Sequence, residues 1–284
     1  MFMKTIAIIG TGLMGTDIAC ASAMAGFEVL LYDIDKERAE QALGRLKDRF
    51  KRYVHTGRID QGKADAFMRH FCLCTTLEEV REALIVIECA FEEIHVKQQI
   101  FRDLDRICRA DAVLASNTSS ISITEIASAT KRPESVIGLH FLNPAHVMKL
   151  VEIIPGIATT RETVETAKTF VKKLGKVNVE SKDYPGFLLN RMLVPLINEA
   201  IYLLYEDAGT AESIDRVMKV GLNFPMGPLA LADMIGLDVL LAVIEEMHRG
   251  YSDSKYRPCP LLKKYVAAGY LGKKSGRGFF IYND

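Results

Sequence analysis

The sequence is short of net charge, of long apolar runs and of repeats. Among its 284 residues, Lys+Arg and Asp+Glu number 36 each, so the formal net charge is zero. Proteins whose main partner is nucleic acid usually carry a basic excess, and this balance argues against that class. The apolar stretches are too short or too interrupted to cross a bilayer, which takes about 20 consecutive apolar residues. We therefore expect neither a nucleic-acid binder nor a membrane-spanning protein.

Cysteines are few and scattered, and most of the six lie inside apolar runs. This usage is typical of reduced, buried thiols rather than of a disulfide framework. Cys72 and Cys74 alternate along an expected strand, but no second Cys/His pair has ligand spacing, so we expect no metal site. The first expected strand begins at Lys4, which leaves no room for a signal peptide. A cytoplasmic protein is the expectation.

The first part of the chain alternates apolar, β-branched runs with helical periodicity, a pattern that predicts a doubly wound, mostly parallel α/β sheet. The expected strands are 4–9, 28–32, 71–75, 84–88, 112–116, 135–140, 149–154 and 176–180. The expected helices are 13–25, 35–55, 60–69, 93–109, 122–128 and 161–173.

After Pro185-Gly186 the pattern changes to helices, which predicts a Rossmann-type domain over 1–184 and an all-α domain over 185–284. The helices expected there are 187–207, 210–220, 227–248 and 259–268, with one short strand at 278–282. The segment 187–207 is apolar on nearly every side. A helix of this kind must be buried, and about 100 residues can hardly surround it, so we expect a homodimer built on these helices.

The N-terminal segment carries Gly10-x-Gly12-Leu13-Met14-Gly15 between an expected strand and an expected helix. Gly10 permits a tight turn, Gly12 lets the backbone approach a pyrophosphate, and Gly15 allows the helix to pack close to the strand. The helix N-terminus offers unpaired N–H groups and a partial positive charge to phosphates. The motif in this position predicts a dinucleotide site.

Asp33 ends the second expected strand, close to the distance of about 20 residues at which an acidic residue bonds a ribose 2′-hydroxyl. A carboxylate there repels a 2′-phosphate, so NAD is favoured over NADP, although Lys36 and Arg38 could weaken that repulsion.

Three further features follow apolar strands. Polar residues 116–120 come at a strand end, where ligands of open α/β sheets bind, but taken alone they fit better a turn that caps the next helix. His140 is the best candidate acid–base, since imidazole titrates near pH 6.5, but a core histidine has the same pattern. Glu152 lies inside an apolar strand. If His140 and Glu152 lie on neighbouring strands, Glu152 could orient the imidazole; otherwise it is an edge residue that faces water.

Taken together, the motifs resemble those of the 3-hydroxyacyl-CoA dehydrogenases, and the later ones are most similar to short-chain members from bacteria. The matching segments include Glu88-x-x-x-Glu92, Ser116-Asn-Thr-Ser-Ser120, His140-Phe-x-Asn143-Pro, Met148-Lys-Leu-Val-Glu152, Pro185-Gly-Phe-x-x-Asn190-Arg, Phe224-Pro-Met-Gly-Pro-Leu-Ala-Leu-Ala-Asp233 and Lys274-Ser-Gly-Arg-Gly-Phe279. They cover essentially the whole chain in order.

The resemblance implies an NAD-dependent enzyme that interconverts (S)-3-hydroxyacyl-CoA, such as 3-hydroxybutyryl-CoA, and 3-oxoacyl-CoA. It implies a catalytic base at His140 with Glu152 as its partner. The other implied positions are Ser119 on the substrate oxygen, Asn190 in the same cleft, Asn117 near the nicotinamide carboxamide, Glu92 and Lys97 near the nicotinamide ribose, and Asn143 beside the histidine. Leu142 and His146 depart from the family, where an aromatic residue and a proline are common.

CoA also needs cations, and the segment 47–63 holds six basic residues against two acidic ones. Lys51 and Arg58 are the candidates to contact CoA phosphates, although a solvated basic face fits the same pattern. Two rival functions stay open at this point. One is a related dehydrogenase of a free hydroxy acid or sugar acid, and the other is a non-catalytic NAD-binding protein on the same fold.

Overall fold

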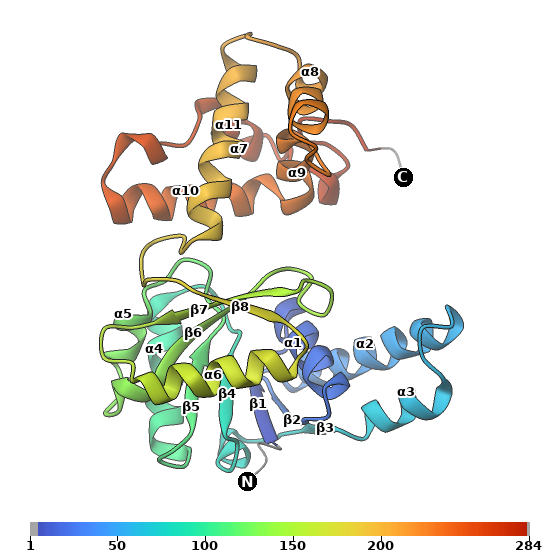
Figure 1. The fold of residues 1–284 in the computed structure, drawn as a ribbon, viewed down its shortest axis with the longest axis vertical. Helices are drawn as coiled ribbons and strands as arrows, with labels where there is room; N and C mark the ends of the chain where they lie inside the picture. Colours follow the sequence, from blue (N-terminus) through green and yellow to red (C-terminus); the bar gives the residue numbers. More distant parts are fainter. Residues whose placement is uncertain (1–4, 283–284) are drawn as a thin grey trace. The chain divides into compact units, whose positions relative to one another are not determined.

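The chain divides into two compact units, Met1–Asp183 and Tyr184–Asp284. The computed structural model describes residues 5–282 (Figure 1). The first unit contains one sheet and its covering helices, and the second is helical. None of the helices within residues 5–282 has the length and apolar character needed to cross a membrane.

The sheet of the first unit has eight strands in the order β3-β2-β1-β4-β5-β6-β7-β8. The strands are β1 (Thr5–Ile9), β2 (Glu28–Tyr32), β3 (Phe71–Leu73), β4 (Ile85–Glu88), β5 (Val113–Ser116), β6 (Val136–Phe141), β7 (Leu150–Pro155) and β8 (Val177–Glu180). All neighbouring pairs are parallel except β6 and β7, which form an antiparallel pair. The predicted doubly wound, mostly parallel sheet is confirmed.

Helices follow the strands of this unit, and Figure 1 shows them on both faces of the sheet. They are α1 (Leu13–Met24), α2 (Lys36–His55), α3 (Gln61–Met68), α4 (Ile94–Ile107), α5 (Ile123–Ala127) and α6 (Arg161–Lys173), with short 3-10 turns η1 (Leu77–Val80) and η2 (Pro133–Ser135). Several begin at the residues that the sequence favours as N-caps. Asp35, Asp60 and Thr160 each accept a hydrogen bond from a first-turn backbone N–H.

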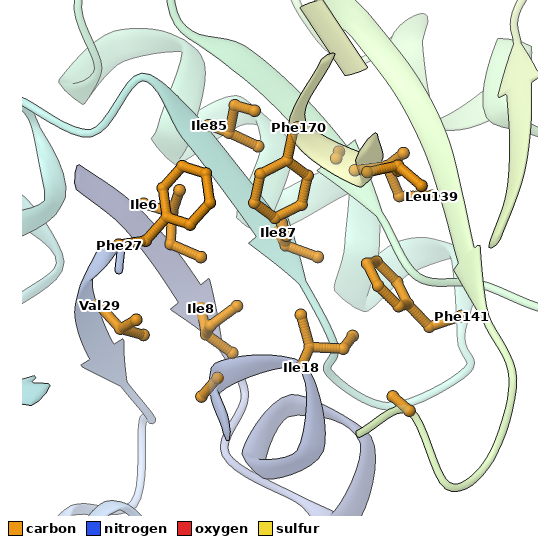
Figure 2. Packing of buried hydrophobic residues seen from close by; sticks show 14 of the residues in the cluster. Ile6, Ile8, Ile18, Phe27, Val29, Ile85, Ile87, Leu139, Phe141 and Phe170 are labelled. Carbon is orange, nitrogen blue, oxygen red and sulfur yellow. The ribbon is translucent and has the colours of Figure 1, made fainter. Parts of the chain in front are cut away.

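The core on the α1 and α6 side of the sheet consists of β-branched strand residues and aromatic rings (Figure 2). Ile18 of α1 and Phe170 of α6 are fully buried in one cluster with Ile6, Ile8 and Ile87. Strand residues that point to the opposite face are also buried. A parallel sheet covered on both faces reads as continuous apolar runs, which is why the strands could be located from the sequence.

The second unit is built from helices around their own core. They are α7 (Leu189–Tyr205), α8 (Ala211–Arg216), a π-helical turn η3 (Val217–Gly221), α9 (Pro228–Ile235), α10 (Leu237–Tyr251), η4 (Ser254–Tyr256), α11 (Pro260–Ala267) and η5 (Lys273–Ser275). Val194, Ile197, Ile201, Leu240 and Ile244 are among the residues of α7 and α10 that form this core.

The single helix predicted over 227–248 is wrong, because α9 and α10 are separate helices. Gly236 joins them with φ +103°, a conformation that cannot continue a right-handed helix and that L side chains rarely adopt. The apolar periodicity runs through both helices, so periodicity alone could not reveal the break.

The predicted strand at 278–282 is also wrong, because the segment forms only isolated bridges, Gly272 to Arg277 and Arg277 to Ile281. Its backbone donors bind a carboxylate instead of a neighbouring strand. Asp233 of α9 accepts hydrogen bonds from the N–H groups of Phe279 and Phe280, each at 2.9 Å. Burial raises the pKa of Asp233, although these hydrogen bonds act in the opposite direction.

Candidate active site

The glycine turn between β1 and α1 has the geometry of a phosphate-binding turn. Gly10 has φ +92°, and a Cβ at Gly15 would lie 2.0 Å from the carbonyl oxygen of Gly10, so both positions require glycine for packing reasons. A Cβ at Gly12 would meet no atom of residues 5–282 within 4 Å, so packing among these residues does not explain that glycine. Close approach of a ligand does explain it. Gly12 is the N-cap of α1 and supplies no side-chain cap, so the first-turn N–H groups can bind phosphate.

Leu13 and Met14 start helix α1 beside this turn. Leu13 is exposed, whereas Met14 packs against the buried core. Ile34 and Phe91, which the sequence analysis did not single out, are exposed apolar residues that follow β2 and β4. The guanidinium of Arg38 lies 5.7 Å from the centroid of the Phe91 ring. Exposed apolar side chains around the turn suit a planar base of a dinucleotide.

Asp33 is held by donors from its own neighbourhood. Its Oδ2 accepts hydrogen bonds from the backbone N–H of Thr11 at 2.7 Å and from the Thr11 hydroxyl at 3.0 Å, and its Oδ1 accepts from the N–H of Asp35 at 3.1 Å. Thr11, a residue of the turn that the sequence analysis passed over, thus orients the carboxylate. The turn, the helix N-terminus and the oriented acid fit a nicotinamide dinucleotide.

His140 and Glu152 face each other across the antiparallel pair β6–β7. They are register partners, and Nδ1 of His140 lies 2.8 Å from Oε2 of Glu152. The side chain of Glu152 is 1% exposed, so it is not an edge residue that faces water. An ionised carboxylate can only accept, so Nδ1 carries the proton of this hydrogen bond and the neutral ring has its lone pair on Nε2.

The antiparallel direction of β7 is what makes this pairing possible. His140 is near the carboxyl end of β6, and Glu152 is near the amino end of β7. Reversing one strand brings these two ends to the same edge of the sheet, where the carboxyl ends of β1, β4 and β5 also lie. The imidazole and the glycine turn therefore belong to the same edge.

The polar segment 116–120 connects β5 to its neighbours through side chains. Ser116 is fully buried and donates to Glu88 at 2.6 Å. Oδ1 of Asn117 accepts a hydrogen bond from the N–H of Phe141 at 2.9 Å, which ties the end of β5 to the strand of His140. Ser119 is bound to the Oε1 atom of Glu92 through its N–H, at 3.0 Å. Ser122, not this segment, caps α5.

A buried ion network lies beneath that segment. Nζ of Lys97 is 2.8 Å from Oε1 of Glu88 and 3.2 Å from Oε2 of Glu92. Lys97 and Glu88 are 1% and 0% exposed, whereas the side chain of Glu92 is 40% exposed and is the one member that a ligand can reach. Glu88 begins the motif Glu88-x-x-x-Glu92 that was recognised in the sequence. The ion pair between Glu88 and Lys97, nine residues later, was not predicted.

Each charge in this network stabilises the ionised form of its partner. Burial by itself would raise the pKa of Glu92, but Lys97 and the hydrogen bonds from Thr118 and Ser119 lower it overall. Burial by itself would lower the pKa of Lys97, but Glu88 and Glu92 raise it overall. Both groups therefore stay ionised at neutral pH.

The remaining predicted residues lie in three places. Asn143 is exposed in the segment after β6 and forms a cis peptide bond with Pro144. Asn190 is half-buried in the first turn of α7, in the second unit. Lys51 is an exposed residue of α2 and lines a cavity of about 550 Å³ between α2 and α3. The Arg58 guanidinium lies over the ring of Tyr53, 4.5 Å from its centroid.

One of the basic residues counted in the segment 47–63 does not face solvent. Nη2 of Arg49 lies 2.6 Å from the buried carboxylate of Asp17, on helix α1. Because α2 is amphipathic, its inward face includes this arginine. Arg49 is therefore not available to bind a CoA phosphate.

Known protein families and curated proteins match this chain along nearly its whole length. Residues 5–184 match the model of the 3-hydroxyacyl-CoA dehydrogenase NAD binding domain, and residues 186–282 match that of the 3-hydroxyacyl-CoA dehydrogenase C-terminal domain. A Bacillus subtilis protein named "Probable 3-hydroxybutyryl-CoA dehydrogenase" is 52% identical over 284 residues, which is 100% of this chain and 99% of that protein. The 3-hydroxybutyryl-CoA dehydrogenase of Bradyrhizobium diazoefficiens is 46% identical over 99% of this chain and 96% of its own length.

Among solved structures, the (S)-3-hydroxybutyryl-CoA dehydrogenase of Ralstonia eutropha superimposes with a TM-score of 0.96 at 40% identity and covers 100% of both chains. The N-terminal family model is that of an NAD binding domain, and the glycine turn and Asp33 fit NAD. The chain belongs to the 3-hydroxyacyl-CoA dehydrogenase family and is an NAD-dependent dehydrogenase.

Proposed function

We propose that this enzyme interconverts (S)-3-hydroxybutyryl-CoA, or a similarly short (S)-3-hydroxyacyl-CoA, and the corresponding 3-oxoacyl-CoA. The observation that carries the proposal is the 2.8 Å contact between His140 and the buried Glu152, at the sheet edge that also carries the glycine turn. The names of the most similar relatives support the short acyl chain.

In the proposed reaction, Nε2 of His140 takes the proton of the substrate 3-hydroxyl as the C3–O bond becomes a carbonyl. NAD, when bound, supplies the acceptor for the hydride that leaves C3. Glu152 holds the ring through Nδ1 and stabilises the positive charge that develops on it. In the reducing direction the imidazolium returns the proton to the oxygen.

Other residues are proposed to hold the ligands. Ser119, fixed by its N–H on Glu92, binds the substrate oxygen, and Asn190 contributes a further polar contact to the substrate. Asp33 binds a ribose of NAD, and Glu92 binds the nicotinamide ribose with Lys97 as its buried counter-ion. Asn117 and Asn143 are proposed to lie beside the nicotinamide and the histidine.

We propose that Lys51, rather than Arg58, is the cation that binds a CoA phosphate. Lys51 lines the cavity between α2 and α3 with Lys47, whereas the guanidinium of Arg58 is stacked on Tyr53. Replacement of Lys51 by Met should raise KM for acyl-CoA and leave the Kd of NADH unchanged. Equal KM values in the variant and the wild type would contradict this assignment.

NADH oxidation should be measured with acyl-CoA substrates of different chain length, with free acetoacetate and with NADPH in parallel. We expect the highest kcat/KM with acetoacetyl-CoA and NADH, and no turnover of free acetoacetate. Equal turnover of free acetoacetate would favour a dehydrogenase of free hydroxy acids. Tight NADH binding without turnover of any substrate would favour a non-catalytic NAD-binding protein.

We also propose that residues 185–284 form a substrate and dimerisation domain of a homodimer. Large apolar side chains of this unit are exposed in the single chain, among them Met192, Val217, Val220, Leu222 and Met234. In the proposed dimer, the partner subunit covers these side chains, since interfaces bury exposed apolar residues. Sedimentation velocity at micromolar concentration should give the mass of a dimer, and a monomer would contradict the proposal.

A cytoplasmic location is proposed as well. All six cysteines are free thiols, and Cys72 is exposed, which suits a reducing compartment. Fractionation of the native host with an antibody against the enzyme should recover it with cytoplasmic markers.

A further inference from the structure

A second buried polar cluster lies in the first unit, on residues that the proposed reaction does not use. Asp17 of α1 contacts Arg49 of α2 at 2.6 Å and Nδ1 of His146 at 2.8 Å. The three side chains are 1%, 11% and 16% exposed, respectively. His146 belongs to the segment 142–149, which joins β6 to β7.

A carboxylate inside a helix that packs on a sheet is costly. An aspartate there needs a cation and hydrogen-bond donors, whereas a small apolar residue would need neither. Arg49 supplies the cation, and Nδ1–H of His146 supplies a donor from a segment 129 positions away in sequence. The contact therefore ties the segment 142–149 to α1 and, through Arg49, to α2.

The same segment is also held by Lys176, the residue before β8. Nζ of Lys176 donates to the carbonyl oxygens of Ala145 and Met148, at 2.7 and 2.6 Å. Ala145 is buried in the core, whereas Asn143 and Val147 are exposed. The segment therefore has a fixed inner side and an outer side that a ligand can contact.

Helix α2 connects this cluster to the glycine turn. Arg45 and Arg49, four residues apart, lie on the same side of α2. Nη2 of Arg45 donates to the carbonyl oxygen of Thr11 at 2.8 Å, and Arg49 contacts Asp17. One side of α2 thus holds both the turn before α1 and the Asp17–His146 contact.

We propose that His146 is a positioning residue. Through Asp17 and Arg49 it joins the segment that follows His140 to the helix whose N-terminus receives the coenzyme phosphates. Binding of NADH at the turn then restrains the segment 142–149, which follows the strand of His140. The inference rests on the proposed function for its kinetic consequence but not for the coupling itself.

Amide hydrogen exchange tests the coupling without turnover. The N–H groups of Val147 and Met148 donate to the carbonyl of Pro144, at 3.0 Å each, and report on the segment. NADH should slow their exchange in the wild type, in His146→Asn, whose amide nitrogen can replace Nδ1, and in the control Val147→Ala. His146→Leu should lose this protection. Absence of protection in the wild type, or equal protection in H146L, would overturn the proposal.

Kinetics provides the second measurement. H146L should raise KM for acetoacetyl-CoA about tenfold with kcat within about twofold, equivalent to about 1.4 kcal/mol. H146N should restore KM. If H146L lowers Tm and kcat but leaves KM unchanged, the role is structural and the proposal fails. If H146L does not fold, His146→Ser removes the contact with less change in apolar surface and must give the same pattern.

The two proposals fail in different ways. A wild type that does not reduce acetoacetyl-CoA contradicts the proposed function, while the exchange experiment still decides the coupling. A wild type that turns over normally but shows no effect of NADH on Val147 and Met148 contradicts the coupling alone.

Discussion

Two glutamates of the first unit are buried to a similar degree but have different partners. Glu152, on β7, lies beside the imidazole of His140, and Glu88, at the end of β4, lies beside the ammonium group of Lys97. In both pairs a carboxylate is removed from water and needs a hydrogen-bond donor beside it. The donor is an imidazole in one pair and an ammonium group in the other.

The partner decides what each pair can do. Glu88 and Glu92 keep the pKa of Lys97 above its usual value, so this cation stays charged and serves as a fixed support. An imidazole can accept and release a proton near neutral pH, so the His140–Glu152 pair suits proton transfer. A change in the first pair should therefore affect stability, and a change in the second should affect turnover.

The largest effect is expected for His140→Gln. Glutamine cannot exchange a proton near neutrality, so kcat should fall about 10²- to 10⁴-fold, the usual contribution of general acid–base catalysis. The free energy of unfolding and the Kd of NADH should change little. Steady-state assays and fluorescence titration measure these quantities, with His95→Gln, an exposed histidine, as the control. Near-normal turnover would remove His140 from its proposed role.

Lys97→Met should mainly lower the free energy of unfolding, whereas His140→Gln should mainly lower kcat. Loss of Lys97 leaves the carboxyl group of Glu88 buried without its cation, which should lower the free energy of unfolding by about 3–5 kcal/mol. Urea denaturation measures this loss, and the exposed Lys172→Met is the matched control. A double variant with Glu88→Gln should recover part of the stability, because the uncompensated charge is gone. Equal stability losses in K97M and K172M would contradict the comparison.

Asp33 is a third carboxylate of this unit, and it accepts hydrogen bonds from the neutral N–H and hydroxyl groups of Thr11. Asp33→Ala should weaken NADH binding and raise the ratio of kcat/KM for NADPH to that for NADH by about tenfold, or about 1.4 kcal/mol. Parallel assays with both coenzymes give the ratio. An unchanged ratio would mean that Asp33 does not contact the ribose.

The smallest effect is expected for Glu92→Gln in acid. The pKa of Glu92 is lowered in the folded state, so its contribution to stability is present above the ordinary glutamate pKa of about 4.3 and is lost as pH falls through the lowered value. Because the side chain is partly exposed, the contribution should not exceed about 1 kcal/mol. The loss of stability on acidification, measured by urea denaturation, should be smaller in E92Q than in the wild type. A larger loss of stability in E92Q than in the wild type would contradict a stabilising contribution from ionised Glu92.

Much of the sheet could be predicted because each strand is buried on both faces and therefore appears as an apolar run. The expected strand at 28–32 has the same bounds as β2, and the expected helix at 161–173 has the same bounds as α6. The two wrong predictions, the single helix over 227–248 and the strand at 278–282, lie where the chain changes direction without a change in its apolar pattern. Gly236 interrupts a helical period, and Asp233 takes the backbone donors of the segment after Gly278.

Residues close together in the chain specify the glycine turn, the acid at the end of the second strand and the order of sheet and helices, so these features could be predicted. The pairing of the buried charges depends on the three-dimensional fold. His140 meets Glu152 because β7 runs antiparallel to β6, and Lys97 meets Glu88 because α4 returns along the sheet. Asp17 meets His146 across 129 positions. Local propensity carries no information about such pairs, since long-range packing, not neighbouring residues, sets their distance.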